Sequence, residues 1–144
     1  MPRHLAAAGV RVLHFGMTPK DLMLSAFAKA EDPNSGGRQM PGHFGQKSNR
    51  ILTVSSPVTT QLPHAVGVAL AGKMKKKDFI TFTTLGEGSS NQGDFHEGMN
   101  FAGVHKLPVV IMVENNKYAI SVPVERQLAS KNVSDRAIVT PGMP

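Results

Sequence analysis

Two short apolar runs, each followed by a polar cluster, stand out in the pattern of the chain. The first run covers residues 79–85 and ends at Gly86-Glu87-Gly88, and the second covers Val109–Val113 and ends at Glu114-Asn115-Asn116. Apolar runs of this length between turn residues favour buried strands of a parallel sheet. The segment between them, from about Asp94 to Lys106, has a helix-like pattern. Strand, helix and strand in this order predict a right-handed crossover unit, in an α/β fold whose mostly parallel sheet is flanked by helices.

Both polar clusters follow the carboxyl ends of their predicted strands, where open α/β sheets bind ligands. Gly86 and Gly88 allow a sharp turn and a close approach of the backbone to a ligand. The Glu87 carboxylate and the Asn116 amide oxygen are ligands that a hard cation such as Mg²⁺ accepts, with phosphate or water completing its shell. Backbone N–H groups of residues 88–90, ahead of a helix, can hold a phosphate. The edge therefore predicts a metal-bridged diphosphate site.

Other segments give weaker signals. Thr18-Pro19-Lys20-Asp21 predicts a helix start, because threonine caps helices and proline suits the first helical position. Ser55–Gln61 predicts a capped start of a second helix, which runs from about Pro63 to Lys76. Residues 38–49 have little periodicity and predict an extended loop. His43 in this loop is interpreted as a hydrogen-bonded loop histidine, with a catalytic role as the second interpretation.

Composition narrows the class of protein. The 144 residues fit one domain, and the absence of cysteine excludes a disulfide framework and thiol chemistry. No segment has the apolar length of a membrane span, and the start lacks the apolar core of a secretory signal. Much of the net charge of +6 comes from the lysines of residues 73–77, which complement a helix end and have no interleaved aromatic residues. These features predict a cytoplasmic protein that binds neither membrane nor nucleic acid.

Three stretches together resemble a known family. Gly86-Glu87-Gly88 followed by Asn115-Asn116 is similar to the thiamine-diphosphate fingerprint, which is usually written G-D-G, a spacer and N-N. Ser35–His43 and Ser55–Pro63 resemble alpha subunits of branched-chain 2-oxo acid dehydrogenases, in which glutamate replaces the aspartate of the fingerprint. Asn115–Pro123 resembles the bacterial members. The resemblance runs from about Phe15 to Arg136 and implies a thiamine-diphosphate-binding fold.

The resemblance also implies roles for individual residues. The expected magnesium ligands are Glu87, Asn116 and the backbone oxygen of Tyr118. The expected contacts to thiamine diphosphate are Ser56, Val58, Gly88 and Ser89. The expected ligands of a potassium ion are Ser55, Pro57, Thr60 and Gln61. No catalytic residue is assigned.

Two positions depart from the family pattern. Ala6, Ala7 and Ala8 stand near the place where the family carries a Tyr-Arg pair that reaches the cofactor. Glu114 occupies the place of an arginine that helps to bind the diphosphate in many relatives, although bacterial relatives share this acid. Part of the expected diphosphate site is therefore altered.

The activity implied is oxidative decarboxylation of branched-chain 2-oxo acids, such as 3-methyl-2-oxobutanoate, within branched-chain amino acid catabolism. The expected partners are a beta subunit in a heterotetramer, a lipoyl acyltransferase that receives the acyl group, and the 2-oxo acid substrate. Because the family's alpha subunit is longer, residues 16–144 are expected to form a partial thiamine-diphosphate-binding domain after a poorly defined segment 1–15. This chain alone is expected to be inactive.

Alternatives remain at this point. A pyruvate dehydrogenase alpha subunit would have the same cofactor and a different substrate, and a truncated, non-catalytic piece of either protein is also compatible with the sequence. A dinucleotide-binding oxidoreductase is disfavoured, because Asn91 occupies the place of the third glycine in the G-x-G-x-x-G pattern.

Overall fold

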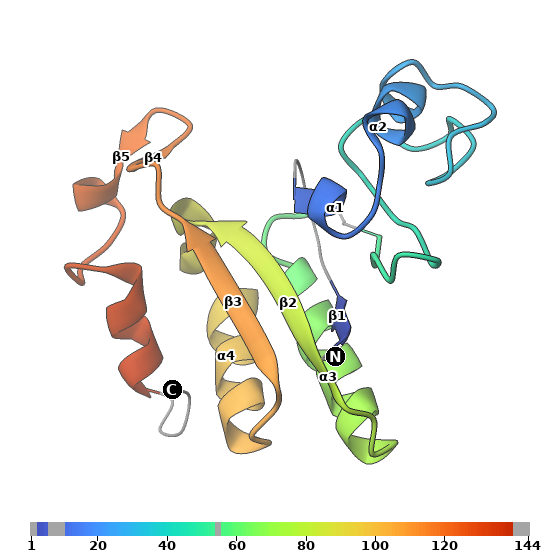
Figure 1. Cartoon of the computed structure of the whole chain (residues 1–144). Helices are drawn as coiled ribbons and strands as arrows, with labels where there is room; N and C mark the ends of the chain where they lie inside the picture. Colours follow the sequence, from blue (N-terminus) through green and yellow to red (C-terminus); the bar gives the residue numbers. More distant parts are fainter. Residues whose placement is uncertain (1–2, 6–10, 54–55, 140–144) are drawn as a thin grey trace. The chain divides into compact units, whose positions relative to one another are not determined.

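The computed structural model describes residues 3–5, 11–53 and 56–139 (Figure 1). The backbone divides into two compact units, and each is described by itself. We call Pro57–Pro144, together with residues 1–3, the sheet unit, and His4–Ser56 the N-terminal unit. The expected domain boundary after residue 15 stays a prediction, as does the expected consequence of the alanines at positions 6–8, which lie outside the described residues.

The strand–helix–strand order expected from the sequence is confirmed in the sheet unit. The elements are α3 (Gln61–Met74), β2 (Phe79–Gly86), the 3-10 helix η1 (Glu87–Asn91), α4 (Gly93–Val104) and β3 (Val109–Glu114). Strands β2 and β3 are parallel, with Thr81 paired to Val109 and Gly86 paired to Glu114. Their carboxyl ends therefore lie at the same edge, as the sequence predicted.

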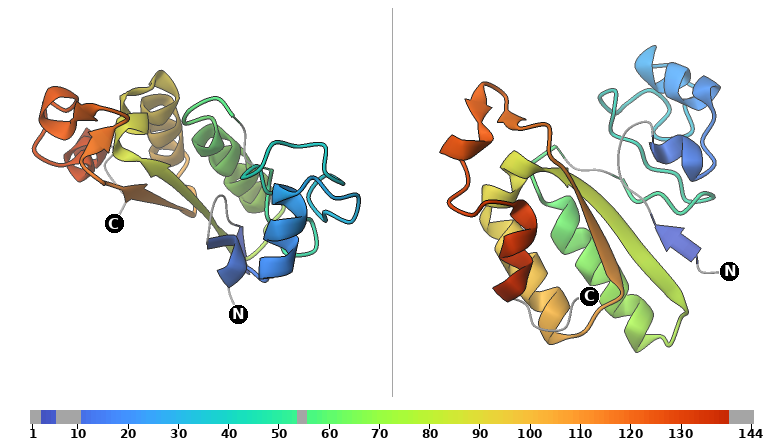
Figure 2. Two further views of the ribbon diagram at one scale, coloured as in Figure 1. Left: turned by 90° about the horizontal axis from the view of Figure 1, so that it is seen from above. Right: turned by 60° about the vertical axis from the view of Figure 1, so that its left-hand side comes forward.

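Helices α3 and α4 lie side by side against one face of β2 and β3, as Figure 1 and Figure 2 show. The core between them is apolar and contains Leu62, Val66, Ala69, Leu85, Phe95, Met99 and Ala102. Gly98 allows the two helices to approach closely, because a Cβ atom at this position would lie 2.9 Å from Cγ of Leu62. Close packing of α4 on α3 thus positions η1, which immediately precedes α4.

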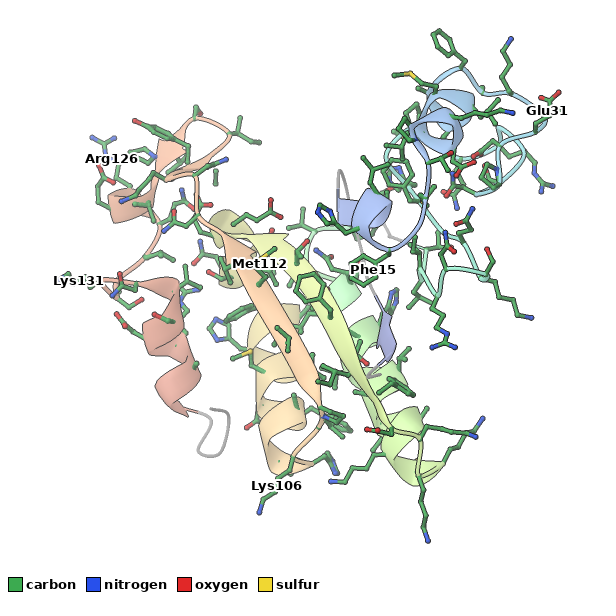
Figure 3. The ribbon with its side chains drawn as sticks, in the orientation of Figure 1. Phe15, Glu31, Lys106, Met112, Arg126 and Lys131 are labelled. Carbon is green, nitrogen blue, oxygen red and sulfur yellow. The ribbon has the colours of Figure 1, made fainter. Side chains whose placement is uncertain are left out.

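Strand β3 differs from the expectation of a fully buried strand. Its side chains alternate between half-buried and exposed positions along Val109–Glu114. Val110 and Met112 are 48% and 38% exposed. Met112 lies on the face opposite the helices (Figure 3), and Val110, two positions earlier in the strand, lies on the same face. Among the described residues, helices cover only one face here, so alternation replaces the continuous burial that is typical of parallel strands.

The chain continues from β3 into a short hairpin and two 3-10 helices. Strands β4 (Tyr118–Ala119) and β5 (Val122–Pro123) are antiparallel, and η2 (Val124–Arg126) and η3 (Val133–Val139) follow. Leu128 and Val133 are buried in the same core as α3 and α4. The segment after β5 therefore packs against the core that α3 and α4 form, although its polar sequence predicted no helix or strand.

The N-terminal unit contains α1 (Arg11–His14) and α2 (Pro19–Ala26), and the short strand β1 (Arg3–Leu5) precedes them. The predicted start of α2 is confirmed, since Thr18 and Asp21 form a capping box of reciprocal backbone–side-chain hydrogen bonds. A small core holds this unit together and contains Val12, Met17, Phe44 and Ile51. No helix within the described residues has the length and apolarity needed to cross a membrane.

Candidate functional site

The candidate site is the turn η1 and the groups around it. Glu87 begins η1 immediately after β2, and the pairing of Gly86 with Glu114 places Asn115 at the same edge. Strand β4 contacts η1 as well. The structure therefore brings together the fingerprint segments that are separated by the whole of α4, as the sequence predicted from parallel strands.

Glu87 has the most unusual environment in the site. Its side chain is 1% exposed, and its Oε1 atom has no hydrogen-bond partner within the described part of the chain. Buried polar atoms are almost always paired, and an unpaired carboxylate oxygen is costly for the folded state. A cation or a donor from a bound molecule would satisfy this oxygen. The carboxylate is therefore suited to hold a ligand rather than to stabilise the fold.

The carbonyl groups of η1 are held by side chains from the turn itself and from before α3. The Ser90 hydroxyl donates to the carbonyl oxygen of Glu87 at 2.6 Å, and the Thr59 hydroxyl donates to the carbonyl oxygen of Ser89 at 2.8 Å. Thr59 is fully buried and has a φ of +77°, which is strained for a β-branched residue. Strain of this kind persists only where the surroundings enforce it, and it is common at functional sites.

The two glycines of the fingerprint differ in their surroundings, since a Cβ atom on Gly86 would meet only Oγ of Ser89, at 3.9 Å. Gly86 has a φ of −76°, which any residue adopts, and Gly88 is not among the described glycines with positive φ. A Cβ atom on Gly88 would lie 2.6 Å from Cβ of Ala119. Glycine at position 88 is thus required for the close contact between η1 and β4, and neither glycine turns the chain through a positive φ. Its contact with the cofactor, and that of Ser89, stay predictions.

The asparagine pair forms two local turns. The Asn115 side-chain oxygen accepts from the Lys117 N–H, and the Asn116 side-chain oxygen accepts from the Tyr118 N–H, both at 2.9 Å. An amide oxygen has two lone pairs, and among the described residues the Asn116 oxygen accepts only from Tyr118, so it could also bind a cation. These turns set the path of the backbone through Tyr118. The backbone carbonyl oxygen of Tyr118 is the atom expected to bind magnesium.

The residues expected around a potassium ion have different surroundings in the structure, and their role stays a prediction. The Thr60 hydroxyl lies 3.0 Å from the carbonyl oxygen of Pro57, so these two oxygens are adjacent. The Gln61 side chain instead donates its amide N–H to the Thr84 carbonyl oxygen at 3.1 Å. Ser55 lies outside the described residues. Val58, expected to contact the cofactor, is 57% exposed.

Ser56 belongs to the N-terminal unit and is bound to His43. The Ser56 hydroxyl and Nε2 of His43 are 2.7 Å apart, and Nδ1 of His43 is 3.2 Å from the Met40 carbonyl oxygen. The interpretation of His43 as a hydrogen-bonded loop histidine is therefore confirmed. The expected contact of Ser56 with the cofactor stays a prediction.

Three residues beside η1 have no signal in the sequence: Thr59, Gln127 and Arg136. Thr59 lies between residues that the resemblance singled out, but only its positive φ and its burial, both features of the structure, show that it has a special position. Arg136 donates to Ser90 and Asn91. Oε1 of Gln127 is buried without a hydrogen-bond partner among the described residues, 3.2 Å from where a Cβ on Gly88 would stand. Arg136 and Gln127 follow β3 by more than ten residues in a polar segment, so no local pattern signalled that they would reach η1.

The donor set fits a magnesium ion that is shared with a diphosphate. Within the described residues, no group of three or more His, Cys, Asp or Glu side chains could hold a metal ion by itself. Glu87 supplies one buried carboxylate with an unpaired oxygen, and Asn116 supplies a neutral amide oxygen at the same sheet edge. Mg²⁺ is commonly held by one or two carboxylates plus substrate phosphates, so this limited set is sufficient for a shared ion.

The fold resembles that of a solved protein described as thiamin diphosphate-dependent. A structure assigned as a thiamin diphosphate-dependent enzyme from Mycobacterium smegmatis aligns with a TM-score of 0.54 and 23% identity. The alignment covers 97% of this chain and 22% of that chain. The α/β class, with a parallel sheet flanked by helices in a thiamine-diphosphate-binding fold, is confirmed.

Relatives in sequence are alpha subunits of one kind of dehydrogenase. The chain is 76% identical over 133 residues to the 2-oxoisovalerate dehydrogenase subunit alpha of Bacillus subtilis, covering 92% of this chain and 40% of that protein. It is 42% identical to a mitochondrial subunit alpha of Arabidopsis thaliana and 39% to that of Mus musculus, covering 25% and 28% of those proteins. The chain thus spans two-fifths or less of the length of these relatives. Residues 7–144 match the family described as dehydrogenase E1 component, and the chain belongs to this family.

Proposed function

We propose that the turn η1 and the neighbouring asparagine pair anchor the diphosphate of thiamine diphosphate through a magnesium ion. The buried Oε1 atom of Glu87, which has no partner in the described part of the chain, carries this proposal. The similarity to a thiamin diphosphate-dependent fold supports the choice of cofactor. When bound, thiamine diphosphate supplies the carbanion stabilisation that decarboxylation of a 2-oxo acid requires.

The chain's own residues have three tasks in this proposal. Glu87 places a negative charge at the sheet edge and so orients the ion. Asn116 adds a neutral oxygen, and its hydrogen bond with the Tyr118 N–H fixes the backbone next to the Tyr118 carbonyl, which would be the third ligand. The hydrogen bonds from Ser90 and Thr59 occupy carbonyl groups of η1, which keeps the backbone of the turn in one conformation before the ligand arrives.

We further propose that the site serves oxidative decarboxylation of branched-chain 2-oxo acids. The support is the 76% identity to a 2-oxoisovalerate dehydrogenase subunit alpha, and relatives from plant and animal mitochondria have the same name. These names favour a branched-chain substrate over pyruvate. A beta subunit, a lipoyl acyltransferase and a potassium ion near Pro57 and Thr60 belong to the same proposal.

The test is calorimetric titration of the chain with thiamine diphosphate in the presence and absence of Mg²⁺. The native chain is expected to bind only with Mg²⁺. Glu87→Gln, which keeps the shape and removes the charge, is expected to weaken binding at least about tenfold, since a carboxylate–cation contact is lost. The matched control is Glu97→Gln, the same change at an exposed position of α4.

Comparing Glu87→Gln with Glu97→Gln separates anchoring by the buried carboxylate from a general effect of charge. Equal binding by the native chain and the Glu87→Gln variant would contradict the proposal. Weakening by Glu97→Gln to the same extent would show that total charge, rather than the buried carboxylate, governs affinity. Circular dichroism of each variant establishes that it is folded before titration.

A further inference from the structure

Arg136 in η3 reaches back to η1 across more than forty positions of sequence. Its NH1 atom donates to the Ser90 carbonyl oxygen and, at 3.0 Å, to the Ser90 hydroxyl. Its NH2 atom donates to the side-chain oxygen of Asn91 at 2.8 Å. One guanidinium group therefore holds two consecutive residues at the end of the turn that begins with Glu87.

The contact extends to Glu87 through a relay of hydrogen bonds. The Ser90 hydroxyl, fully buried, accepts from Arg136 and donates to the Glu87 carbonyl oxygen at 2.6 Å. A hydroxyl that accepts from a charged donor becomes a stronger donor itself, because neighbouring hydrogen bonds polarise each other. The charge on Arg136 thus strengthens the bond that fixes the Glu87 backbone.

The positive charge of the Arg136 guanidinium is also favourable at the carboxyl end of η1. The carbonyl groups at the end of a helical turn carry partial negative charge, and a cation there is favourable. A guanidinium group is planar, remains charged and offers several donors in a rigid fork, so it can bind a carbonyl, a hydroxyl and an amide at once. Lysine at this position could supply charge but only a single point of contact.

We infer that Arg136 is a positioning residue for the candidate site, which acts by locking η1 through Ser90 and Asn91 so that the Glu87 carboxylate is held in place for its ligand. The effect on the ligand rests on the proposed function, whereas the effect on η1 does not. Arg136 touches neither the proposed ion nor the diphosphate in this assignment. Its loss leaves every candidate ligand present and removes only the restraint on the turn.

The first measurement is hydrogen exchange by nuclear magnetic resonance on the 144-residue chain. The amide of Gln92, which donates to the Ser89 carbonyl oxygen, reports on η1, and the amide of Thr81, which donates to Pro108, reports on the sheet. In Arg136→Met, exchange at Gln92 is expected to increase at least about tenfold while Thr81 is unchanged, because hydrogen bonds to a charged group are lost. Unchanged protection of Gln92 in the folded variant would overturn the inference.

The second measurement is the affinity for thiamine diphosphate with Mg²⁺. Arg136→Met is expected to weaken binding about tenfold and Arg136→Lys about threefold, since lysine restores charge without the fork. Lys131→Met is the matched control, because Lys131 is exposed and its side chain points away from the ribbon (Figure 3). Native affinity in a folded Arg136→Met chain would overturn the inference.

A third variant covers the case in which Arg136→Met does not fold. Ser90→Ala keeps the bond from Arg136 to the carbonyl but removes the hydroxyl of the relay, and it is expected to weaken binding and raise exchange at Gln92. Native cofactor affinity and native exchange at Gln92 in Ser90→Ala would contradict the relay of hydrogen bonds from Arg136 through Ser90 to Glu87. If the native chain does not bind the cofactor, the proposed function fails for this chain. Hydrogen exchange at Gln92 then tests by itself whether Arg136 restrains η1.

Discussion

Two buried carboxylates in this chain have opposite surroundings. Asp32 is 5% exposed and accepts hydrogen bonds from Asn34, Ser35 and Gly37, through both of its oxygens. Glu87 is 1% exposed and has an oxygen without a partner in the described part of the chain. The first arrangement stabilises a loop and the second leaves capacity for a ligand, so the two should respond differently to removal of charge.

Asp32→Asn is expected to destabilise the N-terminal unit in a pH-dependent way. Burial acting alone would raise the pKa of Asp32, but the hydrogen bonds from Asn34, Gly37 and Ser35 lower it below its usual value. Because the folded pKa is below the unfolded one, the stabilisation is present above the unfolded pKa and is lost as pH falls through the folded pKa. The expected cost is about 2 kcal/mol at neutral pH.

Urea unfolding as a function of pH measures this difference. The gap in unfolding free energy between the native chain and Asp32→Asn should close as the solution becomes more acidic than about pH 4. Glu31→Gln, at the exposed neighbouring position, is the control and should show no such gap. A gap for Asp32→Asn that is constant down to the acid limit would contradict the assignment.

Thr59→Val tests the hydroxyl that holds η1. Valine has nearly the same shape and tolerates the same packing, so the change removes the 2.8 Å bond to the Ser89 carbonyl oxygen and little else. The expected loss of unfolding free energy is about 1 kcal/mol, together with faster exchange at η1. Thr59→Ser retains the hydroxyl and should preserve most of the protection. Equal exchange in the two variants would contradict a role for the hydroxyl.

At the scale of elements, two helical glycines are expected to behave oppositely. Gly67 in α3 is exposed, and a Cβ atom there would meet nothing within 4 Å. Gly98 in α4 faces α3, and a Cβ atom there would lie 2.9 Å from Cγ of the buried Leu62. Helix propensity alone would favour alanine at both positions, so packing decides the difference.

Gly67→Ala should therefore stabilise the sheet unit by roughly 0.5–1 kcal/mol. Gly98→Ala should destabilise it by about 1 kcal/mol, since overpacking a tight helix contact outweighs the gain in propensity. Thermal and urea unfolding of both variants provide the measurement. Stabilisation by Gly98→Ala would show that Leu62 can move aside and that the approach of the two helices does not depend on glycine.

At the scale of the whole molecule, the site contains groups suited to anchoring. Among the described residues, Thr59 and Arg136 donate hydrogen bonds to η1 and the Gln127 side chain lies beside Gly88, so these side chains hold the turn. We therefore expect the 144-residue chain alone to bind thiamine diphosphate with Mg²⁺ but not to decarboxylate 3-methyl-2-oxobutanoate.

Release of carbon dioxide from the labelled 2-oxo acid measures this prediction, with an artificial electron acceptor present. No release above the cofactor in buffer is expected. Release that depends on Glu87, and that is absent in Glu87→Gln, would contradict the expectation and would assign catalysis to this chain. Addition of a beta subunit to the same sample tests the proposed partner directly.

The sequence by itself determined the parallel strand–helix–strand unit, the start of α2 and the sheet edge at which the segments of Glu87 and Asn116 both lie. Each depends on local information, since strand length, capping residues and the order of elements are encoded over a few positions. The burial of the Glu87 side chain did not follow from this information, because a carboxylate after a strand is more often exposed to solvent.

Only the tertiary structure decided what surrounds the turn η1. The strained Thr59, the close contact of Gly88 with Ala119 and the reach of Arg136 to Ser90 each join segments that are about thirty or more positions apart. Such contacts depend on how helices and loops pack after the strands have paired, and no local period encodes them. The sheet edge that carries the candidate site could therefore be predicted from sequence, whereas the contacts that hold η1 could not.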